Sequence, residues 1–233
     1  MTYRLITANR NYSSWSLRPW VLMRTLGIAF VDDVRPFEAP VNFASFRAFS
    51  PTGQVPALVE IFADGSERTV WDSLGIILYL AERHDGVWPD DIAARVWAQC
   101  ATTEMHAGFA TLRNACTMNV GVRVAFGTPG AALSRDLNRI TELWEQGISQ
   151  FGGPFLAGGS FTAVDAFFAL VAFRIRTYGL DVGPVAQRWV DYILALPAMR
   201  EWEVAALAET WREAGHEAEL AAIGRIIEDY RTG

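Results

Sequence analysis

The sequence contains few of the residues that form disulfides or bind metal ions. It has two cysteines, Cys100 and Cys116, and three scattered histidines among 233 residues. We expect both cysteines on one long helix, about 24 Å apart, which is too far for a disulfide. No Cys-x-x-Cys occurs, so the pattern predicts no metal site and indicates a reducing, cytoplasmic environment.

Positive charge and long apolar runs are also scarce. Lys and Arg number 20 against 26 Asp and Glu, which gives a formal net charge of −6. This balance argues against nucleic acid as the main partner, because binding phosphates requires a surplus of basic residues. No apolar run approaches the roughly 18 residues of a membrane span, and residues 1–4 lead into a predicted strand without a signal sequence. We therefore expect a soluble cytoplasmic protein with no membrane partner.

Three serines lie where a predicted strand gives way to a predicted helix. Residues 3–7 alternate apolar and polar like a strand, and residues from 20 onward repeat apolar residues at helical spacing. Ser13, Ser14 and Ser16 stand between them. Serine is a preferred N-cap, so these hydroxyls could serve only to cap the helix. A helix N-terminus also attracts anions, so they could instead help to bind a phosphate, a carboxylate or a thiolate.

Further elements complete the predicted N-terminal half. Residues 28–31 form a strand after the first helix, which gives a βαβ unit with two parallel strands. The phenylalanines of a short helical segment at 42–49 share one face and are expected in the core. Residues 57–62 and 68–70 are predicted as antiparallel strands joined by a hairpin turn, and a helix covers 73–81.

Two short motifs flank these strands. Gln54-Val55-Pro56 precedes the strand at 57, where a proline is tolerated as the first residue. A trans Val55–Pro56 bond is the commoner form, whereas a cis bond would hold the Val55 backbone outward for pairing with a peptide-like ligand. Asp72 and Ser73 open the helix at 73–81. They could cap it, or they could grip a ligand that has both an ammonium and a carboxylate group.

The second half of the chain is predicted to be helical. Residues 84–91 break the pattern and indicate a linker between a domain at 1–83 and a domain at 92–233. Within the second half, Thr162 and Asp165 form a capping box, which we assign to folding. The predicted helices cover 92–120, 131–151, 163–178, 184–196 and 199–211, followed by a charged amphipathic tail at 214–230.

This order of motifs resembles the cytosolic glutathione S-transferases over nearly the whole chain. A βαβ unit followed by a ββα unit, with a proline before the third strand, is the thioredoxin arrangement. The serines at 13–16, Gln54-Val55-Pro56, Asp72-Ser73 and the capping box then follow in the family's order. The sequence looks most like serine-type bacterial members near the zeta and theta classes. The resemblance implies a thioredoxin-like α/β domain followed by an all-helical domain, and a homodimer.

The resemblance also assigns roles to residues. A serine hydroxyl, Ser13 first and Ser14 second, would stabilise the thiolate of glutathione, the co-substrate; Tyr12 is a rival hydroxyl. Trp15 replaces the cysteine of the zeta class, which argues against that class's isomerisation reaction, and Asp72 replaces the glutamate of many relatives. The residues expected to bind glutathione are Trp15, Gln54, the Val55 backbone, a cis Pro56, Asp72 and Ser73.

The electrophilic substrate is expected over the first helix of the second half. Its predicted pocket residues are Met105, His106, Phe109, Leu112 and Arg113, although the apolar ones could equally be ordinary helix core. The leading hypothesis is a glutathione transferase acting on a small apolar or aromatic electrophile. The alternatives are a glutathione-dependent isomerase or peroxidase, and a glutathione-binding or scaffold protein without catalysis.

Overall fold

A mixed four-stranded sheet forms the N-terminal half of the protein in the computed structural model, which describes residues 2–37 and 43–232. The strands are β1 (Thr2–Thr7), β2 (Phe30–Val34), β3 (Ala57–Ile61) and β4 (Glu67–Val70), in the order β2-β1-β3-β4. Strand β1 pairs parallel with β2 and antiparallel with β3, and β3 pairs antiparallel with β4. The helices of this half are α1 (Ser14–Thr25), α2 (Phe43–Phe46) and α3 (Ser73–Ala81).

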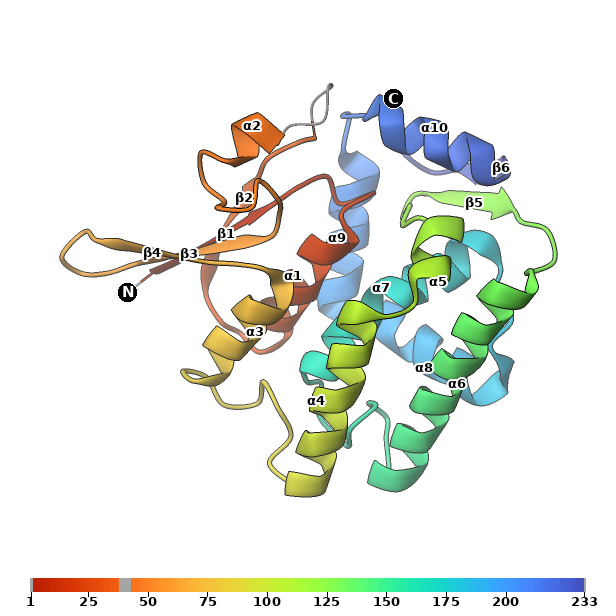
Figure 1. The fold of residues 1–233 in the computed structure, drawn as a ribbon, viewed down its shortest axis with the longest axis horizontal. Coiled ribbons are helices and arrows are strands. Elements are labelled where there is room, and N and C mark those ends of the chain that lie inside the picture. Colours follow the sequence, from red (N-terminus) through yellow and green to blue (C-terminus); the bar gives the residue numbers. More distant parts are fainter. Residues whose placement is uncertain (1, 38–42, 233) are drawn as a thin grey trace.

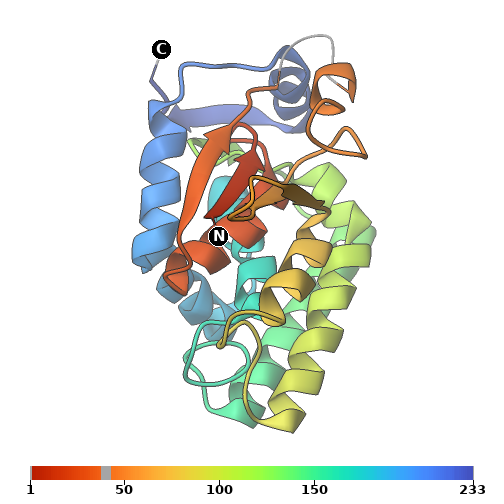
Figure 2. The same cartoon turned by 90° about the vertical axis from the view of Figure 1, so that its left-hand side faces the viewer.

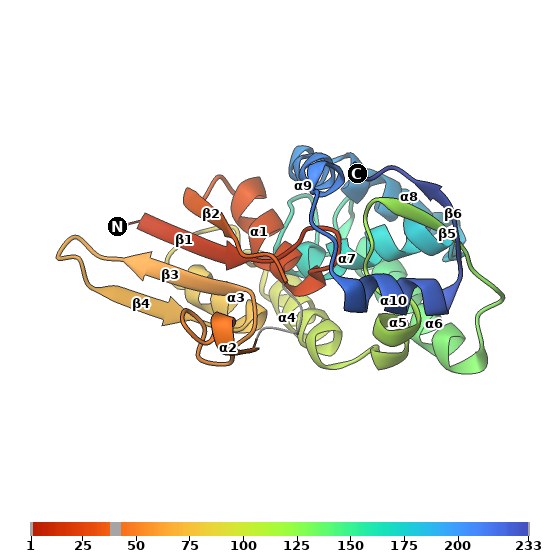
Figure 3. The same ribbon diagram turned by 90° about the horizontal axis from the view of Figure 1, so that it is seen from above.

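Helices dominate the second half, as predicted. Figures 1 and 3 show this helical half beside the sheet. The helices are α4 (Ile92–Ala107), α5 (Ala110–Ala115), α6 (Ala131–Phe151), α7 (Ala163–Tyr178), α8 (Gly183–Ala195), α9 (Pro197–Ala208) and α10 (Ala214–Ile223). The thioredoxin-like domain followed by a helical region is therefore confirmed.

Helix α7 joins the two halves. Nearly all of its residues are buried, and it packs against α1, α4 and α8. Its N-terminus is the predicted capping box: the Asp165 carboxylate accepts the Thr162 N–H at 3.1 Å and also the Leu156 N–H at 2.9 Å. Because α1 contacts both β1 and α7, the start of α1 is held at the boundary between the sheet and the helical half.

The predicted helix at 92–120 is wrong in extent. Helix α4 ends at Ala107, and Phe109 adopts a left-handed backbone with φ of 58°. Helix α5 then ends at Ala115, so Cys100 and Cys116 lie on different elements. Both cysteines are free, and burial raises the pKa of the Cys116 thiol to about 12.

A second sheet was not predicted. The segment after α5 contains β5 (Val122–Ala125), and the tail ends in β6 (Arg225–Asp229), which pairs antiparallel with β5. The tail expected as one amphipathic segment at 214–230 is therefore a short helix followed by a strand. Figure 2, in which the four-stranded sheet faces the viewer, shows this blue C-terminal segment crossing above the sheet.

None of the helices described at 2–37 and 43–232 combines the length and the hydropathy needed to cross a membrane. The domain limits at 83 and 92 stay a prediction. They fall between α3 and α4, where the chain leaves the sheet half.

Candidate functional site

The turn between β1 and α1 presents the serines. The N–H groups of Tyr12 and Ser13 both donate to the Asn9 carbonyl, at 3.1 and 2.8 Å, which shapes the turn. Ser13 is the N-cap by position, yet its side chain makes no capping hydrogen bond. In the described part of the chain, no side chain accepts from the first N–H groups of α1. The positive end of this 12-residue helix is therefore open to an anion.

The two candidate serines differ in their contacts. The Ser13 hydroxyl donates to the Ser16 hydroxyl at 2.7 Å. The Ser14 hydroxyl accepts a long contact of 3.5 Å from the buried Arg174 guanidinium. Ser14 thus keeps its own proton for another acceptor, whereas the Ser13 proton is already shared. Ser16 is buried, and its hydroxyl also accepts the Ala8 N–H.

Tyr12 is not a free hydroxyl donor. Its phenol donates to the Glu217 carboxylate at 2.6 Å. Burial and this hydrogen bond raise the pKa of Tyr12 well above its usual range. The Tyr12 hydroxyl, the alternative to the serines, is therefore already hydrogen-bonded to a residue of the C-terminal helix α10.

The Gln54-Val55-Pro56 motif lies next to the serine turn. The Val55–Pro56 bond is cis, as the family resemblance implies. The backbone N–H and C=O of Val55 make no hydrogen bond within residues 2–37 and 43–232. Both backbone groups of Val55 are therefore available for a ligand.

Asp72 caps helix α3, as the simpler interpretation expected. Its carboxylate accepts the N–H groups of Leu74 and Gly75 at 2.9 and 3.3 Å. It is nevertheless half-exposed, lines the same cavity as Val55, and lies 3.4 Å from the His106 imidazole. Ser73, in contrast, is fully buried. Its hydroxyl faces the Arg18 guanidinium at 3.4 Å and is not among the cavity residues.

Three arginines gather behind the serine turn. Arg18 and Arg113 lie over the Trp15 ring at 3.9 and 4.9 Å from its centroid, and Arg174 reaches Ser14. Each guanidinium has one buried nitrogen without a hydrogen-bond partner. Burial lowers the pKa of all three, to about 10 for Arg174, and the positive charges of Arg113 and Arg174 lower that of Arg18 further. The cluster makes the serine turn electropositive.

A cavity of about 370 Å³ brings several of these groups together. It is large enough for a small peptide-sized ligand. Its walls come from the β1–α1 turn, the segment before β3, the start of α3 and helix α10. The lining residues are Tyr12, Ser13, Ser14, Trp15, Phe37, Phe46, Thr52, Gly53, Gln54, Val55, Pro56, Asp72 and His216.

None of the five predicted electrophile residues lines this cavity. Met105, Phe109 and Leu112 belong to the hydrophobic core, so for them the ordinary core interpretation holds. Arg113 donates to the carbonyls of Met105 and His106 at the end of α4. His106 lies edge-on to Trp15, and burial lowers its pKa.

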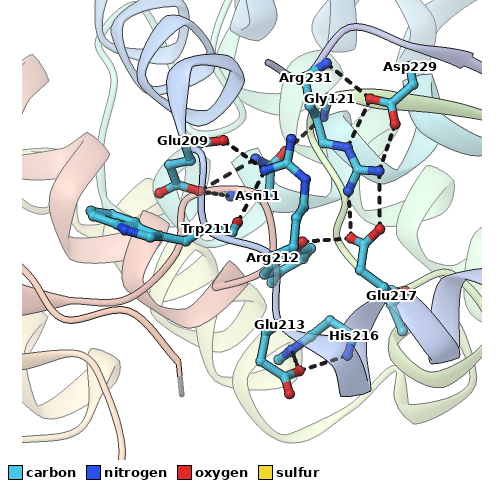
Figure 4. Close-up of polar contacts among 12 residues, drawn as sticks. Asn11, Gly121, Glu209, Trp211, Arg212, Glu213, His216, Glu217, Asp229 and Arg231 are labelled. Carbon is cyan, nitrogen blue, oxygen red and sulfur yellow. Dashed lines mark hydrogen bonds and ion pairs between the residues drawn. The ribbon is translucent and has the colours of Figure 1, made fainter. Parts of the chain in front are cut away.

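Helix α10 contributes residues that the sequence did not reveal. His216 stacks on the ring of Tyr12, and Glu217 accepts the Tyr12 hydroxyl. Just before this helix, the buried Glu209 accepts the N–H groups of Arg10 and Asn11 at 2.6 and 3.3 Å (Figure 4). Nothing in the charged tail distinguishes these residues from solvated ones. Phe46, which also lines the cavity, belongs to the regularly spaced phenylalanines at 42–49, so its spacing was a signal in the sequence.

Among residues 2–37 and 43–232, no three His, Cys, Asp or Glu side chains form a group that could hold a metal ion. The cavity lining offers hydroxyls, backbone groups, a carboxylate and a histidine.

Comparison with known proteins identifies the fold and the first domain. Residues 12–83 match the family model for the glutathione S-transferase N-terminal domain. Residues 12–83 are therefore similar to a glutathione S-transferase N-terminal domain. The match includes the end of the β1–α1 turn, the cis proline and α3, which supply much of the cavity wall, whereas His216 of α10 lies outside it. No curated protein matches the sequence.

Solved glutathione S-transferase structures resemble the whole chain. Isozyme E7 of Drosophila melanogaster is 18% identical, with 99% of this chain and 98% of that one covered and a TM-score of 0.66. A glutathione transferase homologue from Burkholderia, solved with bound glutathione, is 19% identical over 88% and 98%, with a TM-score of 0.65. Ure2p in complex with glutathione is 17% identical over 86% and 97%, with a TM-score of 0.63. At these identities the likeness establishes the glutathione S-transferase fold.

The predicted resemblance to the cytosolic glutathione S-transferases is thereby confirmed. The serine-type bacterial subclass and the individual roles of the site residues stay predictions.

Proposed function

We propose that this protein is a glutathione transferase that binds glutathione in the cavity beside α1. The observation that supports this most directly is the convergence of four features from three segments on one cavity. The open N-terminus of α1, the unpaired Val55 backbone, the cis Pro56 and the Asp72 carboxylate all face it. A tripeptide with a thiol, an ammonium and carboxylates has a complementary group for each of these features.

The backbone of Val55 would pair with the cysteinyl part of the tripeptide. Gln54 and Asp72 would hold the γ-glutamyl end, where a carboxylate can bind an ammonium group. The burial of Ser73 leaves it a supporting role through Arg18 instead of a direct contact. Trp15, held between the cavity and the arginines, would cover one side of the ligand.

The thiol would lie at the start of α1. The contacts favour Ser14 as the donor to the thiolate, because the Ser13 proton is shared with Ser16. Arg174 would orient the Ser14 hydroxyl by donating to its oxygen. A charge-assisted hydrogen bond of this kind contributes about 1.5 to 3 kcal/mol, enough to lower a thiol pKa by about one to two pH units. The helix dipole and the three arginines act in the same direction.

With the thiolate formed, the reaction would be its addition to a small electrophile. The aromatic side chains of Phe37 and Phe46 offer an apolar wall for an aromatic or apolar substrate. This places the proposed electrophile nearer α2 than the α4 residues expected from the sequence. The predicted homodimer and cytoplasmic location complete the proposal.

The test is the ultraviolet absorbance of the bound thiolate against pH, for the native protein and for Ser13→Ala and Ser14→Ala. We expect Ser14→Ala to raise the pKa of bound glutathione by about one to two pH units, and Ser13→Ala to raise it less. A larger effect of Ser13→Ala would make Ser13 the donor.

Two results would contradict the proposal itself. If the native protein bound glutathione without lowering its thiol pKa, it would be a binding protein and the serines would be caps. If glutathione did not bind at all, the glutathione S-transferase fold would remain and the proposed function would be wrong.

A further inference from the structure

The imidazole of His216 is held between two aromatic rings at the cavity. Its centroid lies 4.8 Å from that of Tyr12 with an interplanar angle of 15°, and 5.1 Å from that of Phe37 with an angle of 24°. All three rings line the cavity together with Ser13 and Ser14. The stack therefore fixes the plane of a histidine from α10 beside the start of α1.

The orientation of this ring within its plane is also fixed. His216 Nδ1 lies 2.7 Å from the Glu213 carboxylate. Glu213 is the N-cap of α10, and it accepts the N–H groups of Gly215 and His216 at 2.9 and 2.8 Å, as Figure 4 shows for His216. A carboxylate against Nδ1 favours the tautomer with the proton on Nδ1 and the lone pair on Nε2.

The second ring nitrogen is unoccupied. Nε2 of His216 has no hydrogen-bond partner in the part of the chain that the structure describes. A carboxylate, an imidazole and an open Nε2 at a cavity that also contains serine hydroxyls form the geometry of a general base.

We propose that His216, oriented by Glu213, accepts the proton of the glutathione thiol; this rests on the proposed glutathione site. The S–H bond breaks and an Nε2–H bond forms, which gives a thiolate beside an imidazolium with no change in net charge. Cysteine enzymes activate their thiols with a histidine in the same way.

The rest of the reaction balances through the same nitrogen. The thiolate electron pair forms the new carbon–sulfur bond with the electrophile. In a substitution the leaving group departs with its bonding pair, and the imidazolium returns its proton to water. In an addition to a polarised double bond, the imidazolium protonates the carbon that receives the electrons.

Carboxylates surround His216 at the cavity. Glu213 contacts it directly, and Glu217 lies one residue further along α10, where it accepts from Tyr12 and pairs with Arg231. Asp72 lines the same cavity from α3.

The test compares His216→Phe with His84→Phe. His216→Phe keeps a flat ring for the stack and removes the proton acceptor. His84 hydrogen-bonds to Tyr3 and does not line the cavity, so His84→Phe is the matched control. Turnover is measured with glutathione and chlorodinitrobenzene over a range of pH, glutathione binding by calorimetry, and folding by thermal denaturation.

We expect His216→Phe to lower kcat/KM by about 100-fold near neutral pH, with little change in glutathione affinity. The loss should shrink as pH rises through the pKa of the bound thiol, above which the thiol ionises without a base. His84→Phe should retain native turnover. A His216→Phe protein that bound glutathione and kept kcat/KM within about twofold of the native value would overturn the proposal.

A second variant tests the proposal if the His216→Phe protein does not fold. Glu213→Gln keeps an oxygen for the helix cap and removes the charge that orients the imidazole. We expect it to lower kcat/KM by about tenfold near neutral pH, with the same recovery at higher pH. Native turnover in Glu213→Gln would contradict the proposal that Glu213 orients His216 as a base. Absence of glutathione binding by the native protein would instead refute the proposed function.

Discussion

The carboxylate of Glu209 ties the end of α9 to the turn that presents the serines, and its removal gives a sharp test of this arrangement. It accepts the buried N–H groups of Arg10 and Asn11, while the Asn11 amide also donates to the Ala206 carbonyl at 2.6 Å. Glu209→Ala would leave two backbone N–H groups without a partner.

The expected magnitude follows from these two groups. Each buried N–H left unsatisfied costs about 1–3 kcal/mol, or about 2–6 kcal/mol for the pair. Burial of the Glu209 carboxylate raises its pKa, which shows that the folded state already bears a desolvation cost that the substitution removes. We therefore expect the free energy of unfolding to fall by about 2–4 kcal/mol, equivalent to a loss of roughly 4–16 °C in Tm.

The assay is urea denaturation followed by tryptophan fluorescence, with Glu201→Ala as the control. Glu201 lies in the same helix α9 and pairs with Arg24 at 3.3 Å, but both side chains are at least one-third exposed. Such a surface pair contributes at most about 1 kcal/mol. If Glu209→Ala cost no more than Glu201→Ala, the reasoning that the turn depends on this buried carboxylate would be refuted.

Two further predictions concern the Asp165 carboxylate and a pair of helical glycines. Burial raises the pKa of Asp165 from 3.8 to about 6. Its contribution to stability is therefore present below about pH 4 and is lost as pH rises to about 6. The free energy of unfolding of the native protein should fall by about 3 kcal/mol over that window. Urea titrations of Asp165→Asn at the same pH values should lack this fall, and parallel profiles would contradict the assignment. A Cβ on Gly147 would lie 2.4 Å from both the Leu156 carbonyl oxygen and the Trp97 ring, whereas one on Gly75 meets nothing within 4 Å. Gly147→Ala should therefore destabilise by about 2 kcal/mol or more, and Gly75→Ala should stabilise by about 0.5–1 kcal/mol; thermal melts that moved in the same direction would count against this packing.

Features that depend on neighbouring residues were predictable from the sequence. The hairpin between β3 and β4, the Asp72 cap of α3 and the Asp165 box of α7 all form within a few residues of chain. Their hydrogen bonds are local, so residue type and spacing were sufficient evidence. The serine turn and the segment before Pro56 were located for the same reason.

Features that depend on distant segments were not predictable. At the break after α4, Phe109 adopts a left-handed backbone conformation, which its residue type does not predict. The ring of Phe109 packs on Phe168 of α7. Strand β6 exists because it pairs with β5, about a hundred residues earlier. Met105 of α4 belongs to the core, and α7 packs against α4.

The sequence alone therefore determined the thioredoxin-like order of elements, the family resemblance and the position of Ser13, Ser14 and Val55. Only the tertiary structure decided which hydroxyl keeps a free proton, and that α10 brings His216 to the same cavity. The physical reason is the range of the interactions. Local hydrogen bonds and periodic burial depend on residues that are close in the sequence. A contact with a residue some two hundred positions away depends on the packing of the whole chain.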